Sequence, residues 1–185
     1  MAVIVSMLRG VNLGSHNRIE MAALCAVYEA LGLRDPQTYV QSGNVVFRTK
    51  ERDPTALARK IEKAIERSFG FRTPVIVRTR LELRDVVRRN PFARRSGIDP
   101  SKLLVMFLAS EPGAEAREQA LKIKTEPEEL RIDGREAYMY FPNGMGRPKV
   151  SWVAIEKKLK TSGTGRNWNS VTKLLEIAER LEADE

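Results

Sequence analysis

The chain has 185 residues, a formal net charge of +8 and 42% hydrophobic residues. This composition is typical of a folded globular protein and excludes a chain that is mainly disordered. The longest apolar run, residues 103–109, is far shorter than the roughly 20 residues that cross a bilayer, and residues 1–5 lack the basic leader of a signal peptide. The single cysteine, Cys25, excludes an internal disulfide and favours a cytoplasmic protein.

The first 80 residues predict a strand over 3–8, a glycine-bearing loop and a helix over 21–31. Residues 38–41 and 44–48 are rich in β-formers and predict a hairpin. A second helix follows Asp53, a favourable N-cap, and ends at Gly70, and residues 74–79 form the next strand. This order, β-α-β-β-α-β, is that of the ferredoxin-like split unit, in which two helices cover one face of a four-stranded antiparallel sheet.

The second half repeats much of this order. Thr79 and Glu82 have the spacing of a capping box for a helix over 80–89. Residues 103–109 predict a buried strand, 113–123 a helix, and 129–133 with 135–141 a hairpin. Residues 151–159 and 167–181 predict two helices, so a helix is expected where the first half has its last strand.

The predicted fold class is therefore α+β, with two tandem ferredoxin-like halves, antiparallel sheets and a C-terminal helix. The predicted organisation is a first half over 1–80, a helical connector over 81–101 and a second half over 102–185. The two halves could fold separately or as one compact unit.

The positive charge is concentrated between Arg67 and Arg95. This segment, called here the basic band, holds two carboxylates, Glu82 and Asp85, and nine arginines, at positions 67, 72, 78, 80, 84, 88, 89, 94 and 95. The band is consistent with a solvated helix face, and also with a surface for an anionic partner, nucleic acid included, because guanidinium groups suit phosphate and carboxylate.

The sequence offers few catalytic groups. His16 is the one histidine and has no second histidine to form a metal pair, and Cys25 lies on the apolar stripe of the first helix. No nucleophile elbow, Walker loop or zinc-protease motif occurs. The catalytic residues, if the protein is an enzyme, are therefore unknown from the sequence, which predicts no metal site and no cofactor.

Polar residues in glycine-bearing turns are the candidate ligand-binding groups. Such turns can present backbone N–H groups to an anion, and a helix N-terminus adds partial positive charge. Turn chemistry, helix capping and core packing of the tryptophan explain the same residues without a ligand. The candidates are Arg9, Asn12 and Gly14 in the first loop, Gln41, Ser42 and Asn44 at the hairpin, and Arg166, Asn167, Trp168 and Asn169 at the last helix.

At these residues the chain resembles an uncharacterised bacterial family, domain of unknown function 1697 (DUF1697). The matching stretches run through most of the chain, and are residues 8–14 with Met21, 41–47, 90–92, 138–142 with Gly144, 156–159 and 166–169. The resemblance implies an α+β fold of two ferredoxin-like halves and implies no activity.

Three functions remain open. The favoured one is a cytoplasmic binding module for an anionic ligand, either a phosphorylated small molecule or nucleic acid. The second is a small metabolite enzyme in which Arg9 and Arg166 clamp an anionic substrate, oriented by Asn12, Gln41, Asn44 and Asn169. In the third, the polar turns are purely structural and join the two halves through buried hydrogen bonds.

Overall fold

The computed structural model describes residues 1–184 and divides the chain into two compact units. The first unit comprises residues 1–85 and 172–185, and the second comprises residues 86–171. Each unit contains one four-stranded antiparallel sheet, so the fold is mixed α+β, as the sequence predicts. These bounds differ from the predicted halves over 1–80 and 102–185. One division falls within the helix over residues 80–89 and the other within the last helix, so residues 172–184 are grouped with the first unit.

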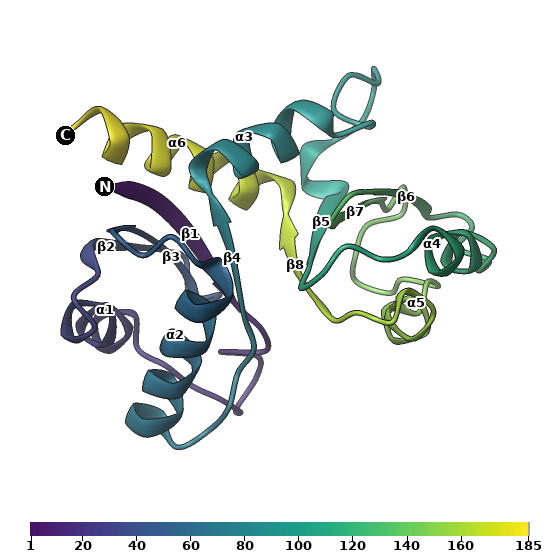
Figure 1. Ribbon diagram of the computed structural model, residues 1–185. Helices are drawn as coiled ribbons and strands as arrows, with labels where there is room; N and C mark the ends of the chain where they lie inside the picture. Colours follow the sequence, from purple (N-terminus) through teal and green to yellow (C-terminus); the bar gives the residue numbers. More distant parts are fainter. Residues whose placement is uncertain (185) are drawn as a thin grey trace. The chain divides into compact units, whose positions relative to one another are not determined.

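The first unit follows the predicted order of elements (Figure 1). Its sheet has the strand order β2-β3-β1-β4, and two helices contribute to the core on one of its faces. The elements are β1 (Ala2–Leu8), α1 (Met21–Ala30), β2 (Arg34–Tyr39), β3 (Asn44–Thr49), α2 (Pro54–Phe69) and β4 (Val75–Thr79).

Local signals set the helix ends at the predicted residues. The Asp53 carboxylate accepts hydrogen bonds from the N–H groups of Thr55 and Ala56, at 2.8 and 3.1 Å, and Gly70 ends α2 with a φ of 77°. The next helix, α3 (Arg80–Arg89), begins with the predicted capping box. Thr79 N–H donates to the Glu82 carboxylate at 2.8 Å, and Glu82 N–H donates to Thr79 Oγ1 at 3.1 Å.

The second unit has the sheet order β6-β7-β5-β8. A short 3-10 helix, Pro100–Lys102, precedes it. The elements are β5 (Leu103–Leu108), α4 (Ala114–Leu121), β6 (Glu129–Asp133), β7 (Glu136–Tyr140), α5 (Trp152–Leu159) and β8 (Gly163–Asn167), and α6 (Trp168–Ala183) follows and continues into the first unit.

Strand β8 corrects the sequence-based prediction, which expected no last strand in the second half. Gly163–Asn167 pairs antiparallel with β5, with Val105 opposite Arg166. Two glycines in five residues weaken the β signal. Gly163 is needed here, because a Cβ would lie 2.9 Å from the Phe107 carbonyl oxygen. A Cβ on Gly165 would lie 2.7 Å from Met106 Sδ, which belongs to a flexible side chain that can shift.

Each unit has its own apolar core between its sheet and helices. The first contains, among others, Ile4, Leu8, Phe47, Leu24, Tyr28, Ile61 and Ile65. The second contains, among others, Met106, Leu108, Met139, Phe141, Ile155 and Leu159. Among the helices of residues 1–184, none combines the length and the apolar character needed to cross a membrane.

Candidate functional site

The ten candidate residues divide between the two units. Six lie in the first unit, in the loop after β1 and the turn between β2 and β3, and four lie in the second, at the junction of β8 and α6. The candidates therefore form two groups, one in each unit.

Asn12 holds the loop after β1 in place. Its Oδ1 accepts a hydrogen bond from Ile19 N–H at 2.8 Å, while its Nδ2 donates to Ile19 O at 3.0 Å and to Gln41 O at 2.8 Å. Asn12 has a φ of 55°, in the left-handed region that asparagine tolerates better than most residues. The side chain thus joins the loop to the β2–β3 turn and is committed to backbone groups.

The β2–β3 turn is built in the same way. Asn44 is fully buried and its Nδ2 donates to Ser42 Oγ at 2.7 Å and to Tyr39 O at 3.3 Å. Gly43 has a φ of 72°, and a Cβ there would lie 2.6 Å from Val11 Cγ2 and 2.8 Å from Leu8 Cβ. This close packing requires glycine. Gln41 is exposed, as is Gly14 in the neighbouring loop.

In the second unit, Arg166 is an interior residue with 7% of its surface exposed. Its Nη1 donates to Thr164 Oγ1 and to Gly165 O, both at 2.8 Å. Burial lowers the pKa of this guanidinium to about 10, because the charged form loses hydration. Arg166 thus lies in the framework of β8 rather than on an open surface.

Asn167 caps α6, one of the capping roles that the sequence suggests for this turn. Its Oδ1 accepts from Asn169 N–H at 2.9 Å, and its Nδ2 donates to Ser101 O at 2.9 Å. Trp168 is 8% exposed and Asn169 is exposed.

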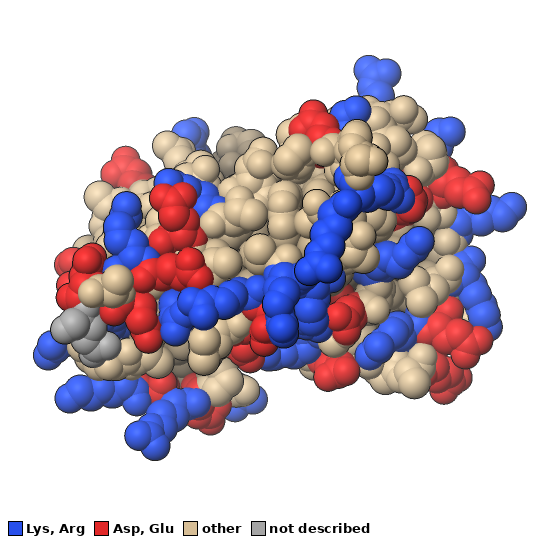
Figure 2. Space-filling model, turned by 90° about the horizontal axis from the view of Figure 1, so that it is seen from above, with Lys and Arg blue, Asp and Glu red and all other residues tan. Residues whose placement is uncertain are grey.

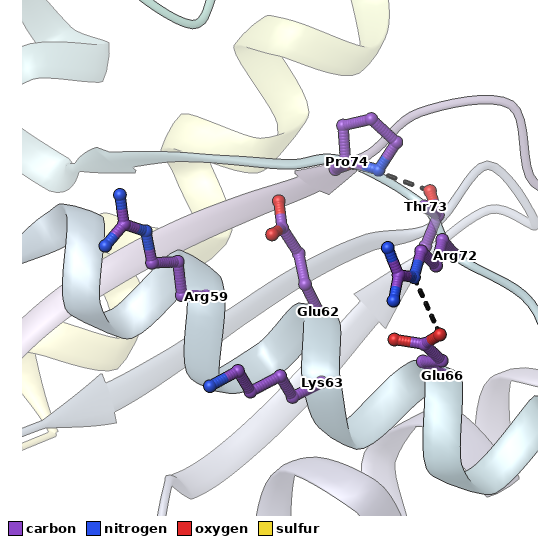
Figure 3. A pocket seen from close by; sticks show the side chains of 7 residues that line it. All are labelled: Arg59, Glu62, Lys63, Glu66, Arg72, Thr73 and Pro74. Carbon is purple, nitrogen blue, oxygen red and sulfur yellow. Dashed lines mark hydrogen bonds and ion pairs between the residues drawn. The ribbon is translucent and has the colours of Figure 1, made fainter.

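A polar pocket of about 360 Å³ lies in the first unit, between α2 and the segment that leads into β4 (Figure 3). Four of its residues project from α2 and three come from the facing segment. They are Arg59, Glu62, Lys63 and Glu66 on α2, and Arg72, Thr73 and Pro74.

Both carboxylates of this pocket have structural partners. Glu62 Oε1 accepts from Val75 N–H at 2.9 Å, which ties α2 to β4, and Glu66 Oε1 lies 2.7 Å from Arg72 Nε. The Glu66 carboxylate raises the pKa of Arg72. Arg59 and Lys63 are exposed, and neither side chain has a hydrogen-bond or ion-pair partner within residues 1–184.

The pocket adjoins the first candidate loop. Thr73 is buried and its Oγ1 donates to Arg9 O at 2.6 Å, while Arg9 N–H donates to Pro74 O at 3.0 Å. Sequence reasoning did not include the pocket, because it followed the apolar stripe of α2. The signal was present on the other face, where Arg59, Glu62, Lys63 and Glu66 have the i, i+3, i+4, i+7 spacing of a single helix face.

Most of the basic band is engaged in ion pairs. In the first unit Arg72, Arg80 and Arg84 pair with Glu66, Glu182 and Glu179. In the second unit Arg89 pairs with Asp133 and Glu136, and Arg95 pairs with Glu129. Figure 2 shows one face of the molecule, on which basic side chains stand beside acidic ones over much of the surface. These pairs favour the interpretation of the band as a structural and solvated feature.

The architecture is that of a mixed α+β protein with two four-stranded antiparallel sheets. The family model described as "Protein of unknown function (DUF1697)" matches residues 1–138, and the chain belongs to this family. This confirms the resemblance that the sequence motifs indicate.

A solved structure shows the same fold. Conserved bacterial protein SP0830 from Streptococcus pneumoniae is 18% identical to this chain, with a TM-score of 0.69, over 96% of this chain and 98% of that one. At this identity the similarity concerns the fold alone. No curated protein matches the sequence.

Proposed function

We propose that the first unit binds a small molecule carrying a phosphate or carboxylate group, in the pocket between α2 and residues 72–74. One observation carries the proposal. Arg59 and Lys63 extend from neighbouring turns of α2 at a pocket of about 360 Å³, without a partner within residues 1–184. Pockets of roughly 300 to 1,000 Å³ are typical of small-molecule sites, and two unpaired cations favour an anion there.

The roles of the two acidic residues support this assignment. Glu66 is neutralised by Arg72, and Glu62 holds the backbone of β4, so both carboxylates shape the walls. With three cations against two carboxylates, the lining keeps a net positive charge. Arg59 supplies a planar fork suited to two oxygens of one anion, and Lys63 supplies a point charge.

Among the sequence candidates, we retain Arg9 as a residue next to this ligand, because its backbone is bound to Thr73 and Pro74 in the pocket wall. The glycine-bearing loop that includes Gly14 begins there. Asn12, Ser42 and Asn44 support this loop and its neighbouring turn, so we assign them a framework role within the first unit. Their hydrogen bonds favour the structural interpretation for these three residues, whereas Gln41 takes part through its backbone carbonyl.

The lining favours binding over catalysis. The two carboxylates of the lining, Glu62 and Glu66, are held by Val75 N–H and by Arg72, and Thr73, the one hydroxyl residue, donates to a backbone carbonyl. Nucleophilic or acid–base catalysis needs a reactive group beside a base. We therefore propose a binding module rather than a metabolite enzyme. We also propose a cytoplasmic location, which the single cysteine favours.

We further propose that each sheet with its two connecting helices is a ferredoxin-like unit. The strand orders β2-β3-β1-β4 and β6-β7-β5-β8 support this, because both place the first and third strands at the centre. The binding proposal rests on the pocket and not on this topology, since one fold serves many functions.

A thermal-shift screen of the purified protein against phosphorylated metabolites, nucleotides and carboxylates tests the binding proposal. A ligand at 100 times its Kd stabilises the folded state by about 2.7 kcal/mol. The shift should disappear in an Arg59→Ala/Lys63→Ala variant and persist in Arg67→Ala, which removes an exposed arginine from the same helix outside the pocket. The absence of any shift across the screen, or equal shifts in both variants, would contradict the proposal.

A further inference from the structure

A second charged pocket lies in the other unit, between α4 and α5. Its volume is about 430 Å³ and it is lined by Glu115, Ala116, Gln119, Ala154, Lys157, Lys158 and Lys160. Three lysines face one carboxylate in this lining. The pocket shares no residue with the one assigned above.

The side chains of the three lysines lack the ion pairs that Lys122 and Lys173 form with neighbouring glutamates. Lys122 lies 2.8 Å from Glu118, and Lys173 lies 2.7 Å from Glu176. The side chains of Lys157, Lys158 and Lys160 make no hydrogen bond or ion pair within residues 1–184. The carboxylate of α5 itself, Glu156, accepts from Gly163 N–H at 2.8 Å and so holds the start of β8.

The backbone at Lys160 also points to a role for this side chain. Lys160 ends α5 with a φ of 55°, in the left-handed region that glycine adopts without steric cost. Glycine fills the corresponding position after α2, where Gly70 has a φ of 77°. Lys160 thus adds a third positive charge to the pocket from a position where glycine would be less strained.

The equivalent groove of the first unit shows that the fold alone does not create this charge. There the groove between α1 and α2 is lined by six uncharged residues and one arginine, namely Ala26, Val27, Ala30, Leu31, Ala64, Ser68 and Arg67. In the second unit, Ala116 and Ala154 provide small side chains between the helices. The positive charges come from Lys157 and Lys158 of α5 and from Lys160, the residue that follows it. Lysines in the last turn also favour the helix dipole, but Lys160 lies beyond that turn.

We propose that the α4–α5 pocket binds a small molecule with two or more anionic groups, such as an oligophosphate or a polycarboxylate. Three mobile ammonium groups can each meet a different oxygen, which suits separated negative charges better than a single bidentate anion. This site goes beyond the function proposed for the first unit.

Amine footprinting with a trace of acetic anhydride tests the site, using inorganic tripolyphosphate as the probe. At ten times its Kd, the probe should slow acetylation of Lys157, Lys158 and Lys160 about tenfold, because only the unbound fraction reacts. Acetylation of the ion-paired Lys122 and Lys173 should not change. Sodium chloride at matched ionic strength serves as the control, and equal slowing by the salt would show screening alone and overturn the proposal.

A Lys160→Gly variant separates binding from folding. Since glycine relieves the left-handed strain, the variant should keep or raise its Tm, while its affinity for tripolyphosphate falls about threefold or more. Unchanged affinity would overturn the proposal. The footprint should be the same in the Arg59→Ala/Lys63→Ala protein, so failure at one pocket is distinguishable from failure at the other.

Discussion

At the scale of single residues, Asn12 shows how one side chain can fix two segments that lie 29 positions apart. It satisfies both backbone groups of Ile19 and also binds the Gln41 carbonyl. Backbone groups that lose their hydrogen-bond partners destabilise the folded state. The Asn12 amide therefore contributes more to the free energy of unfolding than its partial exposure suggests.

Replacing Asn12 tests this role. Asn12→Ala should lower the free energy of unfolding by about 2 to 3 kcal/mol, from lost hydrogen bonds and from alanine in a left-handed conformation. Asn12→Gly removes the same hydrogen bonds without the conformational cost and should lose about 1 kcal/mol less. Urea denaturation of both variants measures the difference, and losses below about 0.5 kcal/mol in both would show that the amide is dispensable.

Tyr28 makes the stability of the first unit sensitive to alkaline pH. The ring is fully buried, its hydroxyl lies 2.8 Å from Ser6 Oγ, and burial raises the pKa of the phenol well above its ordinary value. A group whose pKa is higher in the folded state stabilises that state below the unfolded pKa, and this contribution is lost as the pH rises further. Burial raises the pKa of Tyr138 in the same direction.

We therefore expect the free energy of unfolding to fall as the pH rises above about 10, the ordinary pKa of tyrosine. Arg166, with its lowered pKa, opposes part of this fall. Tyr28→Phe should make the fall less steep, as measured by urea denaturation at a series of pH values. An unchanged slope in the variant would mean that Tyr28 is not held protonated by the fold.

At the scale of elements, the helices were the most predictable parts of the chain. Asp53 and Gly70 bound α2 by side-chain capping and glycine geometry, which are local properties that a sequence displays directly. Strand β8 was missed because its identity depends on pairing with β5, some 60 positions earlier in the chain, and Gly163 and Gly165 conceal it. The pocket on α2 was missed for a related reason: the facing segment, residues 72–74, is placed by tertiary structure.

The close approach at Gly163 gives a test of β8. A Cβ at this position would lie 2.9 Å from the Phe107 carbonyl oxygen, and backbone cannot move aside as a flexible side chain can. Gly163→Ala should therefore lower the free energy of unfolding by about 2 kcal/mol or more. Gly146→Ala is the matched control, because nothing lies within 4 Å of its added Cβ, and it should change stability by less than about 0.5 kcal/mol. Equal effects in the two variants would contradict the packing of β8 against β5.

At the scale of the whole molecule, net charge and binding sites are separate properties. The net charge of +8 arises largely in the basic band, yet five of its nine arginines form ion pairs with carboxylates. The sequence predicted the amount and position of this charge but not its partners, because all the paired acids except Glu66 lie more than about 30 positions away in the chain. Of the sequence candidates, Asn12 and Asn44 proved to bind backbone groups, and Arg9 adjoins the pocket.

This distribution predicts weak association with nucleic acid. Paired arginines release few counterions from a phosphate backbone, so binding to single-stranded RNA should be weak even at low salt and show a shallow salt dependence. A filter-binding titration over a range of salt concentrations measures both quantities. Tight binding with a steep slope would show that the basic band is a nucleic-acid surface after all.

Calorimetric titration of the strongest thermal-shift ligand into three proteins tests whether the α2 pocket binds an anionic small molecule. We expect saturable binding to the wild type and to Arg67→Ala, and an affinity at least about tenfold lower in Arg59→Ala/Lys63→Ala, with the fold of that variant unchanged by circular dichroism. Equal affinity in all three proteins would contradict the proposal, and would place the ligand elsewhere on the chain.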